Sequence, residues 1–317
     1  MNLEVLRRLL EINARRTWNP LGVDEESCGE WAKGLGIPER GETVLYTGCL
    51  YQMAPQIKAF SGLLKRLESM GLSFLETTMK LNTFMLSSGF DVTRLIKPLT
   101  RKERERYFSV LRRIVLALRS SGVDFAYIRR EPYNGVLYHD LGMDSLFEFQ
   151  ARRIAERLSE AGAKRVITVD PHSTYMLRYL LSEYVDRLDL EVAHYTEVLI
   201  GRDYKPGFQD GVEATIHDPC YFARWNGLIE QPRDLLEKAG VRLREPEFSR
   251  EFTGCCGGPI ESIFPRLSSE IARKRFEELR STGSKQVIVS CPICMVNLER
   301  ESRGSGIRVL DLAEVLL

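Results

Sequence analysis

One segment of the chain occurs twice, and this internal repeat limits the folds that the sequence can adopt. Residues 162–178 (GAKRVITVDPHSTYMLR) align with residues 283–299 (GSKQVIVSCPICMVNLE). In each copy a short run rich in β-branched residues leads into an X-Pro turn and then a helix. An amphipathic helix that ends in Gly precedes each copy. The sequence therefore predicts a fold built from two α/β modules.

The repeat extends over most of the chain. The segment ETVLYTGCLY around Cys49 resembles EATIHDPCYF around Cys220, so the two modules also begin alike. We expect parallel-type sheets flanked by helices, with a short helical segment before them. The predicted boundaries are a helical linker at 1–40, a first module at 41–200 and a second module at 201–317.

The first module carries an insertion that the second lacks. The excess lies at about 75–120 and includes a predicted helix from Arg101 to Ser120, which Gly122 follows. The apolar stripe LRRIVLAL in this helix needs a surface to pack on. Packing on its own lobe is favoured over a subunit interface.

The charge balance excludes one large class of function. The chain has 317 residues with 45 basic and 44 acidic side chains, a formal net charge of +1. Nucleic-acid binding needs a field of one sign, so no nucleic-acid partner is expected. No apolar run reaches the roughly 20 residues of a transmembrane helix, and the first residues form an amphipathic helix. We expect a cytoplasmic protein without a transmembrane segment.

Five cysteines follow the spacing C-x34-C-C-x34-C-x2-C and are the strongest chemical signal in the sequence. They are Cys220, Cys255, Cys256, Cys291 and Cys294. Each follows a predicted strand or its turn, and such strand ends converge at one edge of an α/β sheet. Thiolates are soft ligands that suit iron–sulfur clusters or zinc, and the two glycines after the Cys-Cys pair let the backbone wrap closely around a bulky group. Buried core cysteines are the weaker alternative, and zinc is the more serious one.

These residues also resemble a known family. The motif GCCGGP with its flanking cysteines is similar to the cysteine-rich CCG domain of the B-type and D-type components of heterodisulfide reductase. Similar domains occur in iron–sulfur subunits of glycolate oxidase, anaerobic glycerol-3-phosphate dehydrogenase and lactate-utilisation proteins. Two further segments carry the resemblance, HDPCYFARWNGLIEQPRDLLEKAG and NPLGVDEESCGEWAKGLG. It implies a non-cubane 4Fe–4S cluster, one per chain, held by the five cysteines.

The resemblance also implies chemistry at this cluster, the cleavage of a disulfide. The residues expected to take part are Cys255, Cys256 and the neighbouring His217. The sequence alone does not separate a non-cubane cluster from a cubane with a spare cysteine. Arg224, Arg233 and Arg250 near the cluster segment are expected to be solvated rather than bound to an anionic substrate.

Two departures from the family pattern matter. The chain has no C-x2-C-x2-C-x3-C ferredoxin run, so electrons must come from a ferredoxin-type 4Fe–4S subunit or another donor such as a flavoprotein. In the first module, Val136 and Leu137 are aligned with the Cys-Cys pair, while Asp170 and Ser173 take the CxxC positions. A second cluster is therefore not expected.

The first module retains polar residues where a cluster would lie. Cys49, His139, Asp170 and His172 define a secondary site that could hold a substrate, a proton donor or a mononuclear metal. The favoured alternative is a degenerate site, in which Asp170 is the N-cap of a helix with Pro171 at its first position. Cys28 is interpreted as a bystander in a polar linker.

The sequence thus predicts an oxidoreductase, an iron–sulfur redox subunit that resembles heterodisulfide reductase of the B/D type. It would reduce a small disulfide substrate, or relay electrons, at one five-cysteine cluster. An alternative is a non-catalytic electron-transfer subunit of a hydroxy-acid (glycolate or lactate) or glycerol-3-phosphate dehydrogenase complex. A zinc-stabilised scaffold is a third possibility from a different class.

Overall fold

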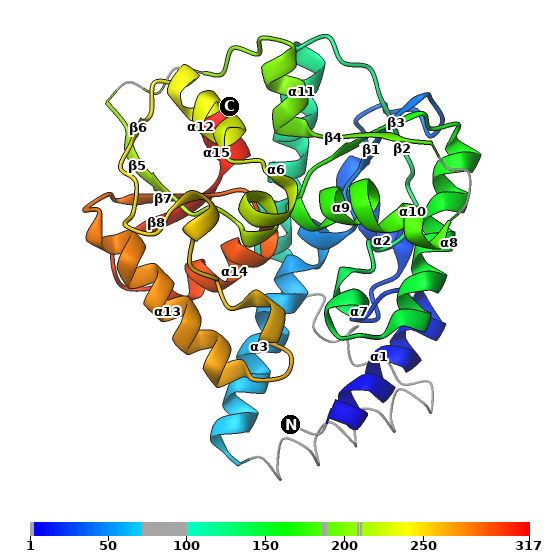
Figure 1. Ribbon diagram of the computed structural model, residues 1–317, viewed down its shortest axis with the longest axis horizontal. Helices are drawn as coiled ribbons and strands as arrows, with labels where there is room; N and C mark the ends of the chain where they lie inside the picture. The colour runs from blue at the N-terminus through cyan, green and yellow to red at the C-terminus, as the bar shows by residue number, and fades with distance from the viewer. Residues whose placement is uncertain (1–2, 72–99, 186–188, 208, 210) are drawn as a thin grey trace.

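Two parallel sheets organise the molecule. The computed structural model describes residues 3–71, 100–185, 189–207, 209 and 211–317. Within these residues the strands form two four-stranded sheets, in which neighbouring strands are parallel. Figure 1 shows one sheet in each half of the molecule, with helices around it. The predicted pair of α/β modules is confirmed.

The first sheet has the strand order β2-β1-β3-β4. Its central strands are β1 (Thr43–Tyr46) and β3 (Arg165–Thr168), and its outer strands are β2 (Ala126–Tyr127) and β4 (Glu191–His194). The central strands are almost wholly buried apart from their first residues. This pattern fits a parallel sheet that is covered on both faces.

The second sheet repeats this arrangement in the order β6-β5-β7-β8. Its central strands are β5 (Glu213–Ile216) and β7 (Gln286–Val289), with β6 (Arg242–Leu243) and β8 (Arg308–Asp311) outside them. In both sheets the second strand in sequence lies outside the first, and the third and fourth follow on the other side. The repeat seen in the sequence is therefore a repeat of topology.

The helices of the first half begin with the N-terminal segment and end before the second sheet. Short 3-10 and π-helical segments carry η labels. The elements are α1 (Leu3–Thr17), α2 (Glu25–Cys28), η1 (Glu30–Ala32), α3 (Leu50–Ser69), α6 (Arg101–Ser120), α7 (Val136–Asp140), α8 (Asp144–Ala161), α9 (Pro171–Tyr175), η2 (Met176–Leu180), α10 (Leu181–Tyr184) and α11 (Tyr195–Gly201).

The second half has fewer long helices. Its elements are η3 (Tyr221–Asn226), α12 (Glu230–Lys238), η4 (Arg250–Phe252), η5 (Gly258–Ile260), α13 (Pro265–Ser281), α14 (Pro292–Glu301) and α15 (Leu312–Leu316). Helices α9 and α14 follow β3 and β7 directly, each with a proline at its first position, as the repeat predicts.

Helix α6 has the bounds predicted from the sequence, Arg101–Ser120. The part of the predicted insertion that spans residues 75–99 lies outside the described residues. Helix α6 packs against α3 and α11 of the first half and against α15 of the second, and Figure 1 shows it in the middle of the molecule. It therefore packs on its own lobe, as the sequence favoured, and also contacts the second module.

Polar contacts cross the boundary between the two modules. The hydroxyl of Tyr51, in α3, donates a 2.6 Å hydrogen bond to the carboxylate of Asp311 at the end of β8. Lys58 forms a 2.8 Å ion pair with Glu299. One cluster of buried apolar side chains also contains residues of both halves. The modules thus share a core.

No helix in the described part of the chain combines the length and apolar character needed to cross a membrane.

Candidate metal centre

Three of the five cysteines of the second module follow the carboxyl ends of its two central strands, and the other two lie in the segment between β6 and α13. Cys220 follows β5 and immediately precedes η3, and Cys255 and Cys256 immediately precede the turn into η5. Cys291 is the N-cap residue of α14 after β7, and Cys294 lies in the first turn of that helix. Strands β5 and β7 are hydrogen-bonded neighbours. Their ends therefore bring residues 71 or more positions apart in sequence to one edge of the sheet.

The five thiols form an unbroken series of contacts. Cys255 hydrogen-bonds with Cys220 on one side and with Cys256 on the other. Cys256 also contacts Cys294, which contacts Cys291. All five are free thiols. The arrangement concentrates sulfur donors at one place, as a bound metal or cluster requires.

One side of this cysteine group is more open than the other. Cys256, Cys291 and Cys294 are buried, whereas Cys220 and Cys255 are partly exposed. The exposed aromatic rings of Trp225 and Phe252 belong to η3 and η4, which contact one another beside these two cysteines. Solvent or a partner molecule would therefore approach from the side of Cys220 and Cys255.

Two glycines allow the backbone to pass close to the thiols. Gly257 has φ +81°, and a Cβ atom there would collide with the carbonyl oxygen of Ser268. A Cβ atom on Gly258 would collide with Ile293 and would lie 3.4 Å from the Cys256 sulfur. Any side chain at these positions would displace the loop that carries the Cys-Cys pair.

The thiols do not ionise equally. Hydrogen bonds donated by Cys220 and Cys256 hold the pKa of Cys255 far below its ordinary value. Burial opposes ionisation of Cys291, but the hydrogen bond from Cys294 and the charge of His172 outweigh it and lower the pKa to about 5. The thiols that donate these bonds have raised pKa values. The group therefore contains two thiolates ready to bind a cation before any metal has displaced the remaining protons.

His217 belongs to this site. Its ring nitrogens and the sulfurs of Cys256 and Cys294 include ligand atoms within 4.8 Å of one another. The Nε–H of Arg275 donates to His217 Nδ1 at 3.1 Å, so the imidazole proton is on Nε2, which has no partner within the described residues. Burial and the charge of Arg275 lower the pKa of His217 to about 3. His217 is thus a neutral N–H donor beside the sulfurs, and its ring is not protonated to the charged form near neutral pH.

A buried ion-pair network supports the loop before the Cys-Cys pair. Both nitrogens at the end of Arg233 donate to the Asp218 carboxylate, at 2.7 and 2.9 Å, and Arg233 also pairs with Glu245 at 2.7 Å. The amide of Arg250 and the hydroxyl of Thr253 bond to Asp218 as well. The expectation that Arg233 is solvated is wrong, because these two carboxylates compensate the burial of its charge.

One residue of the first module, His172, also lies at this site. Its Nδ1 lies 3.9 Å from the Cys291 sulfur and 3.5 Å from a carboxylate oxygen of Asp170. Its ring packs 4.5 Å from that of Tyr221, next to Cys220. Burial disfavours the charged ring, but Cys291 and Asp170 outweigh it and raise the pKa of His172 to about 10. The two modules therefore meet at the cysteine group.

The secondary site expected in the first module does not form as one cluster. Cys49 is disulfide-bonded to Cys28, so its thiol is not a free ligand and Cys28 is not a bystander. His139 packs against the ring of Phe147, and His172 turns to Cys291. Asp170 caps α9 by accepting the amides of the second and third residues after it. Among the described residues, the metal-competent group contains His217, Cys256 and Cys294 and none of these four.

Other residues fill the place of the lost ligands. Gly135 in the first module and Gly257 in the second both have φ +81° and precede a short helix. Matching these glycines places Asn134 opposite Cys256, three positions before Leu137, which the sequence alignment placed there. Asn134 Nδ2 donates to Ser173 Oγ at 2.9 Å, and Ser173 takes the position of Cys294. A hydrogen bond thus replaces a pair of thiols.

The donor set of the second module fits a sulfur-bound metal centre. Five thiols in a continuous series of contacts lie beside two close glycines and a histidine N–H that has no partner among the described residues. This set suits a group that binds thiolates and accepts hydrogen bonds. Five sulfurs exceed the four that a tetrahedral zinc site uses. An iron–sulfur cluster therefore fits this donor set better than zinc does.

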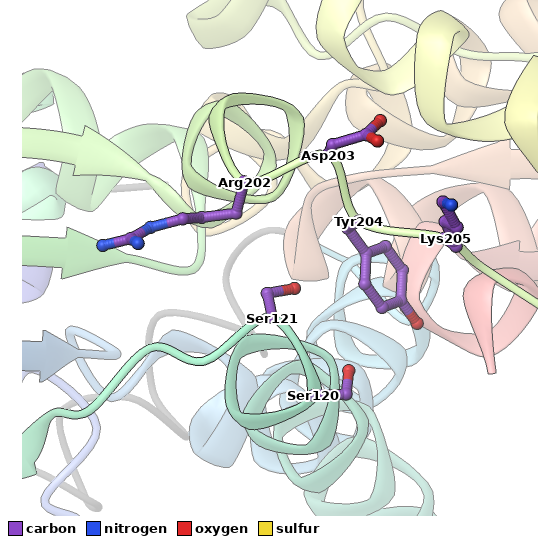
Figure 2. A pocket seen from close by; sticks show the side chains of 6 residues that line it. All are labelled: Ser120, Ser121, Arg202, Asp203, Tyr204 and Lys205. Carbon is purple, nitrogen blue, oxygen red and sulfur yellow. The ribbon is translucent and has the colours of Figure 1, made fainter.

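A separate surface hollow does not involve any of these residues. It is lined by the C-terminal end of α6 and the loop after α11, as Figure 2 shows, with Arg202, Tyr204 and Lys205 among its residues. None of the residues predicted from the sequence as site residues lines it. It is not part of the candidate centre.

Comparison with known proteins gives a family model that matches the second module and relatives that match up to about two thirds of the chain. The family model described as a cysteine-rich domain, CCG, matches residues 214–299. EtfAB:quinone oxidoreductase of Syntrophomonas wolfei is 31% identical over 232 residues, which cover 67% of this chain and 32% of that protein. The probable iron-sulfur-binding oxidoreductase FadF of Bacillus subtilis is 29% identical over 63% of this chain and 30% of its own length.

A third relative is named as part of a heterodisulfide reductase. It is the D component of the dihydromethanophenazine:CoB–CoM heterodisulfide reductase of Methanosarcina acetivorans, which is 33% identical over 137 residues, 40% of this chain and 33% of that component. The chain spans about a third of the length of these relatives.

Proposed function

Because residues 214–299 form a cysteine-rich domain of the CCG type, we propose that the chain is the iron–sulfur part of an oxidoreductase. It holds one 4Fe–4S cluster of the non-cubane type on Cys220, Cys255, Cys256, Cys291 and Cys294. The observation that carries this proposal is the continuous contact among all five thiols at the ends of β5 and β7.

When bound, such a cluster supplies one-electron redox chemistry with iron sites that bind sulfur. The protein's own residues define its surroundings. Two histidines can donate hydrogen bonds to these sulfurs. They are His217 of the second module, through its Nε2–H, and His172 of the first module. The buried Cys256, Cys291 and Cys294 exclude water from the inner side. The outer side, at Cys220 and Cys255, is where a second molecule would approach.

The reaction we propose is the reduction of a small disulfide at this outer side. A relative that matches 40% of this chain is named as part of a heterodisulfide reductase. The partly exposed Cys220 and Cys255 provide the side from which a disulfide would approach. The seven cysteines include no ferredoxin run. The proposed electron donor therefore lies outside these 317 residues, on a ferredoxin-type iron–sulfur subunit or a flavoprotein.

Electron transfer without a bound substrate is the second candidate. The relative that covers 67% of this chain is named EtfAB:quinone oxidoreductase, a name that indicates passage of electrons between other redox groups. Both candidates use the same cluster, and they differ in whether a small thiol or disulfide touches it.

Anaerobic purification followed by iron and sulfide analysis tests the proposal. We expect about four irons and four sulfides per chain in the wild type. Cys294→Ala, which removes the buried thiol that links Cys256 to Cys291 in the contact series, should lose most of the iron. Cys28→Ser is the matched control, because Cys28 is equally buried but belongs to the separate disulfide, and it should retain the iron.

Electron paramagnetic resonance of the reduced protein then separates the two candidates. A signal that changes on addition of a small thiol or disulfide supports reduction at the cluster. An unchanged signal supports the electron-transfer role. Zinc without iron, or equal iron in the wild type and Cys294→Ala, would contradict the iron–sulfur assignment altogether.

A further inference from the structure

The first module contains a second sulfur pair, separate from the five-cysteine group. Cys28 is the last residue of α2, in the N-terminal segment, and Cys49 lies between β1 and α3. The two are joined as a disulfide, with their Cα atoms 5.5 Å apart. Both side chains are buried, at 1% and 0% exposure. The five cysteines of the second module are free thiols and take no part in this bond.

The position of Cys49 matches that of Cys220 in the other module. Each follows the strand that pairs with both the second and the third strand of its sheet, β1 in one case and β5 in the other. The first module thus retains sulfur at the sheet edge that carries the metal-binding thiols in the second. The partner thiol comes from the N-terminal segment, which has no counterpart in the second module.

The oxidation states of the seven cysteines differ. Five are free and two are bonded. In compartments that keep thiols reduced, disulfides are usually transient and serve catalysis or redox sensing. A disulfide in such a compartment is therefore expected to exchange with small thiols, unless the packing around it prevents this.

The surroundings hold both cysteines in place through their backbones. The carbonyl oxygen of Cys28 accepts hydrogen bonds from Gln52 Nε2 at 3.0 Å and from the Tyr127 hydroxyl at 3.3 Å. The buried carboxyl group of Glu131 accepts the Cys49 amide, and it shares the single proton of the Tyr127 hydroxyl with the Cys28 carbonyl. None of these bonds uses the sulfur atoms. They would keep the two thiols within bonding reach after the S–S bond is broken.

The backbone at Cys49 also marks this site. Cys49 has φ +60°, a left-handed conformation that is uncommon for residues other than glycine. Such conformations persist only where the surroundings fix them, and they cluster at functional sites. Here the bonds of Glu131 to Thr47 and Cys49 fix the turn.

We propose that Cys28 and Cys49 form a dithiol–disulfide couple, a two-electron redox centre distinct from the five-cysteine group. Two molecules of a small thiol reduce the bond. The thiolate of the first attacks one sulfur and forms a mixed disulfide, releasing the other cysteine, which takes up a proton. The thiolate of the second attacks the mixed disulfide, so that the products are two protein thiols and one small-molecule disulfide. The couple does not depend on the proposed iron–sulfur function.

Reaction requires the N-terminal segment to move. Arg153 holds Glu25 of α2 through an ion pair of 2.8 Å, and Asp24 caps that helix. Because both sulfurs are buried, a small thiol is expected to reach them only when this segment moves away from α3, which α2 contacts. Exchange is therefore expected to be slow compared with that of an exposed disulfide.

Equilibration with glutathione buffers tests the couple. Cluster-loaded protein, starting either oxidised or fully reduced, is incubated anaerobically at graded ratios of glutathione to glutathione disulfide. It is then quenched in acid, denatured and alkylated, and the peptides that contain Cys28 and Cys49 are quantified by mass spectrometry. The expected result is one midpoint, with the steepness of a two-electron couple, reached from both directions. Cys28→Ser is the control, in which the linked peptide pair must be absent at every ratio.

Three outcomes would overturn the proposal. The pair could stay oxidised in every glutathione buffer, as structural disulfides do. It could be reduced at every ratio, so that no bond forms. Protein that starts oxidised and protein that starts reduced could fail to reach the same midpoint, which would identify a disulfide that burial keeps from reacting. Iron measured on the same samples keeps this result apart from the proposed cluster, because loss of iron with an intact midpoint would contradict only the iron–sulfur assignment.

Discussion

A single histidine of the first module lies against a cysteine of the second. His172 Nδ1 is 3.9 Å from the Cys291 sulfur, and Asp170 lies 3.5 Å from the same nitrogen. Hydrogen bonds to cluster sulfurs are among the factors that set the reduction potential of iron–sulfur centres. A residue outside the cysteine-rich domain can therefore tune the centre that the domain holds.

Replacement of His172 should change the reduction potential of the bound cluster. His172→Ala removes a donor that stabilises the more negative, reduced state, so we expect a lower potential, by about 59 mV for each tenfold change in the equilibrium constant. A potentiometric titration followed by electron paramagnetic resonance measures this. His139→Ala is the control, because His139 packs against Phe147 instead. Equal potentials in all three proteins, with equal iron, would rule out the contact as a tuning element.

Glu131 gives a prediction about pH. Burial outweighs its hydrogen bonds and raises its pKa from 4.5 to about 8. Between these values the native state holds a proton that the unfolded state has released, so this residue makes stability fall as pH rises, by up to about 1.4 kcal/mol per pH unit. Glu131→Gln is neutral throughout and should lack this contribution.

Urea unfolding at pH 5.5, 6.5 and 7.5 measures the effect. The free energy of unfolding of the wild type, relative to that of Glu131→Gln, should decline across the series. The opposite slope, or parallel curves for the two proteins, would mean that the carboxyl is ionised in the folded protein.

At the scale of the elements, two glycines of the chain should respond in opposite ways to alanine. Gly257 has a positive φ, and its Cβ atom would collide with the Ser268 carbonyl, so Gly257→Ala should lose stability and iron. Gly62 lies inside α3 with open space around it, so Gly62→Ala should gain about 0.5–1 kcal/mol. Thermal unfolding and iron analysis of both variants check this. Retention of iron and stability in Gly257→Ala would show that the loop relaxes without cost.

The regular elements could be predicted from the sequence because their signals are local. The Val-Ile runs lie inside β3 and β7, the strands that they predict. The Gly that predicts the end of α8 follows that helix directly. The N-cap role of Asp170 was likewise indicated by the Asp-Pro pair. Because parallel strands end at one edge, the same signals also indicate that the five cysteines lie close together.

The contacts between distant elements could not be predicted in this way. Cys28 lies in a segment with no repeat partner, so nothing in the sequence points to Cys49. The approach of His172 to Cys291 depends on how the two modules pack. The residues that replace the Cys-Cys pair differ from the sequence alignment because the matching feature, the left-handed Gly135, is a backbone conformation rather than a residue pattern.

For the whole molecule, the boundary between the modules should govern stability. Tyr51 donates to Asp311, whose burial raises the pKa of its carboxyl to about 7. Tyr51→Phe leaves that carboxyl without this donor and should cost about 1.5–3 kcal/mol. The cost should grow above pH 7, because the bond favours the charged form. Unfolding in urea at pH 6 and pH 8 measures both effects.

Tyr107→Phe is the matched control for this variant. The Tyr107 hydroxyl is buried in the same core but has no hydrogen-bond partner within the described residues. Its removal should be nearly neutral. Equal losses in the two variants would mean that the ring, not the bond to Asp311, matters at this boundary.

The hydrogen bond between Asn134 and Ser173 has a consequence for biogenesis. A Cβ atom on neighbouring Gly48 would collide with Ser173, so this corner of the first module is already filled. The packing of this corner therefore needs no delivery of inorganic iron and sulfide, whereas the cysteine edge of the second module is completed only when its proposed cluster is inserted. His172 belongs to the module that needs no cofactor, so the side chain that faces Cys291 does not depend on that insertion for its place.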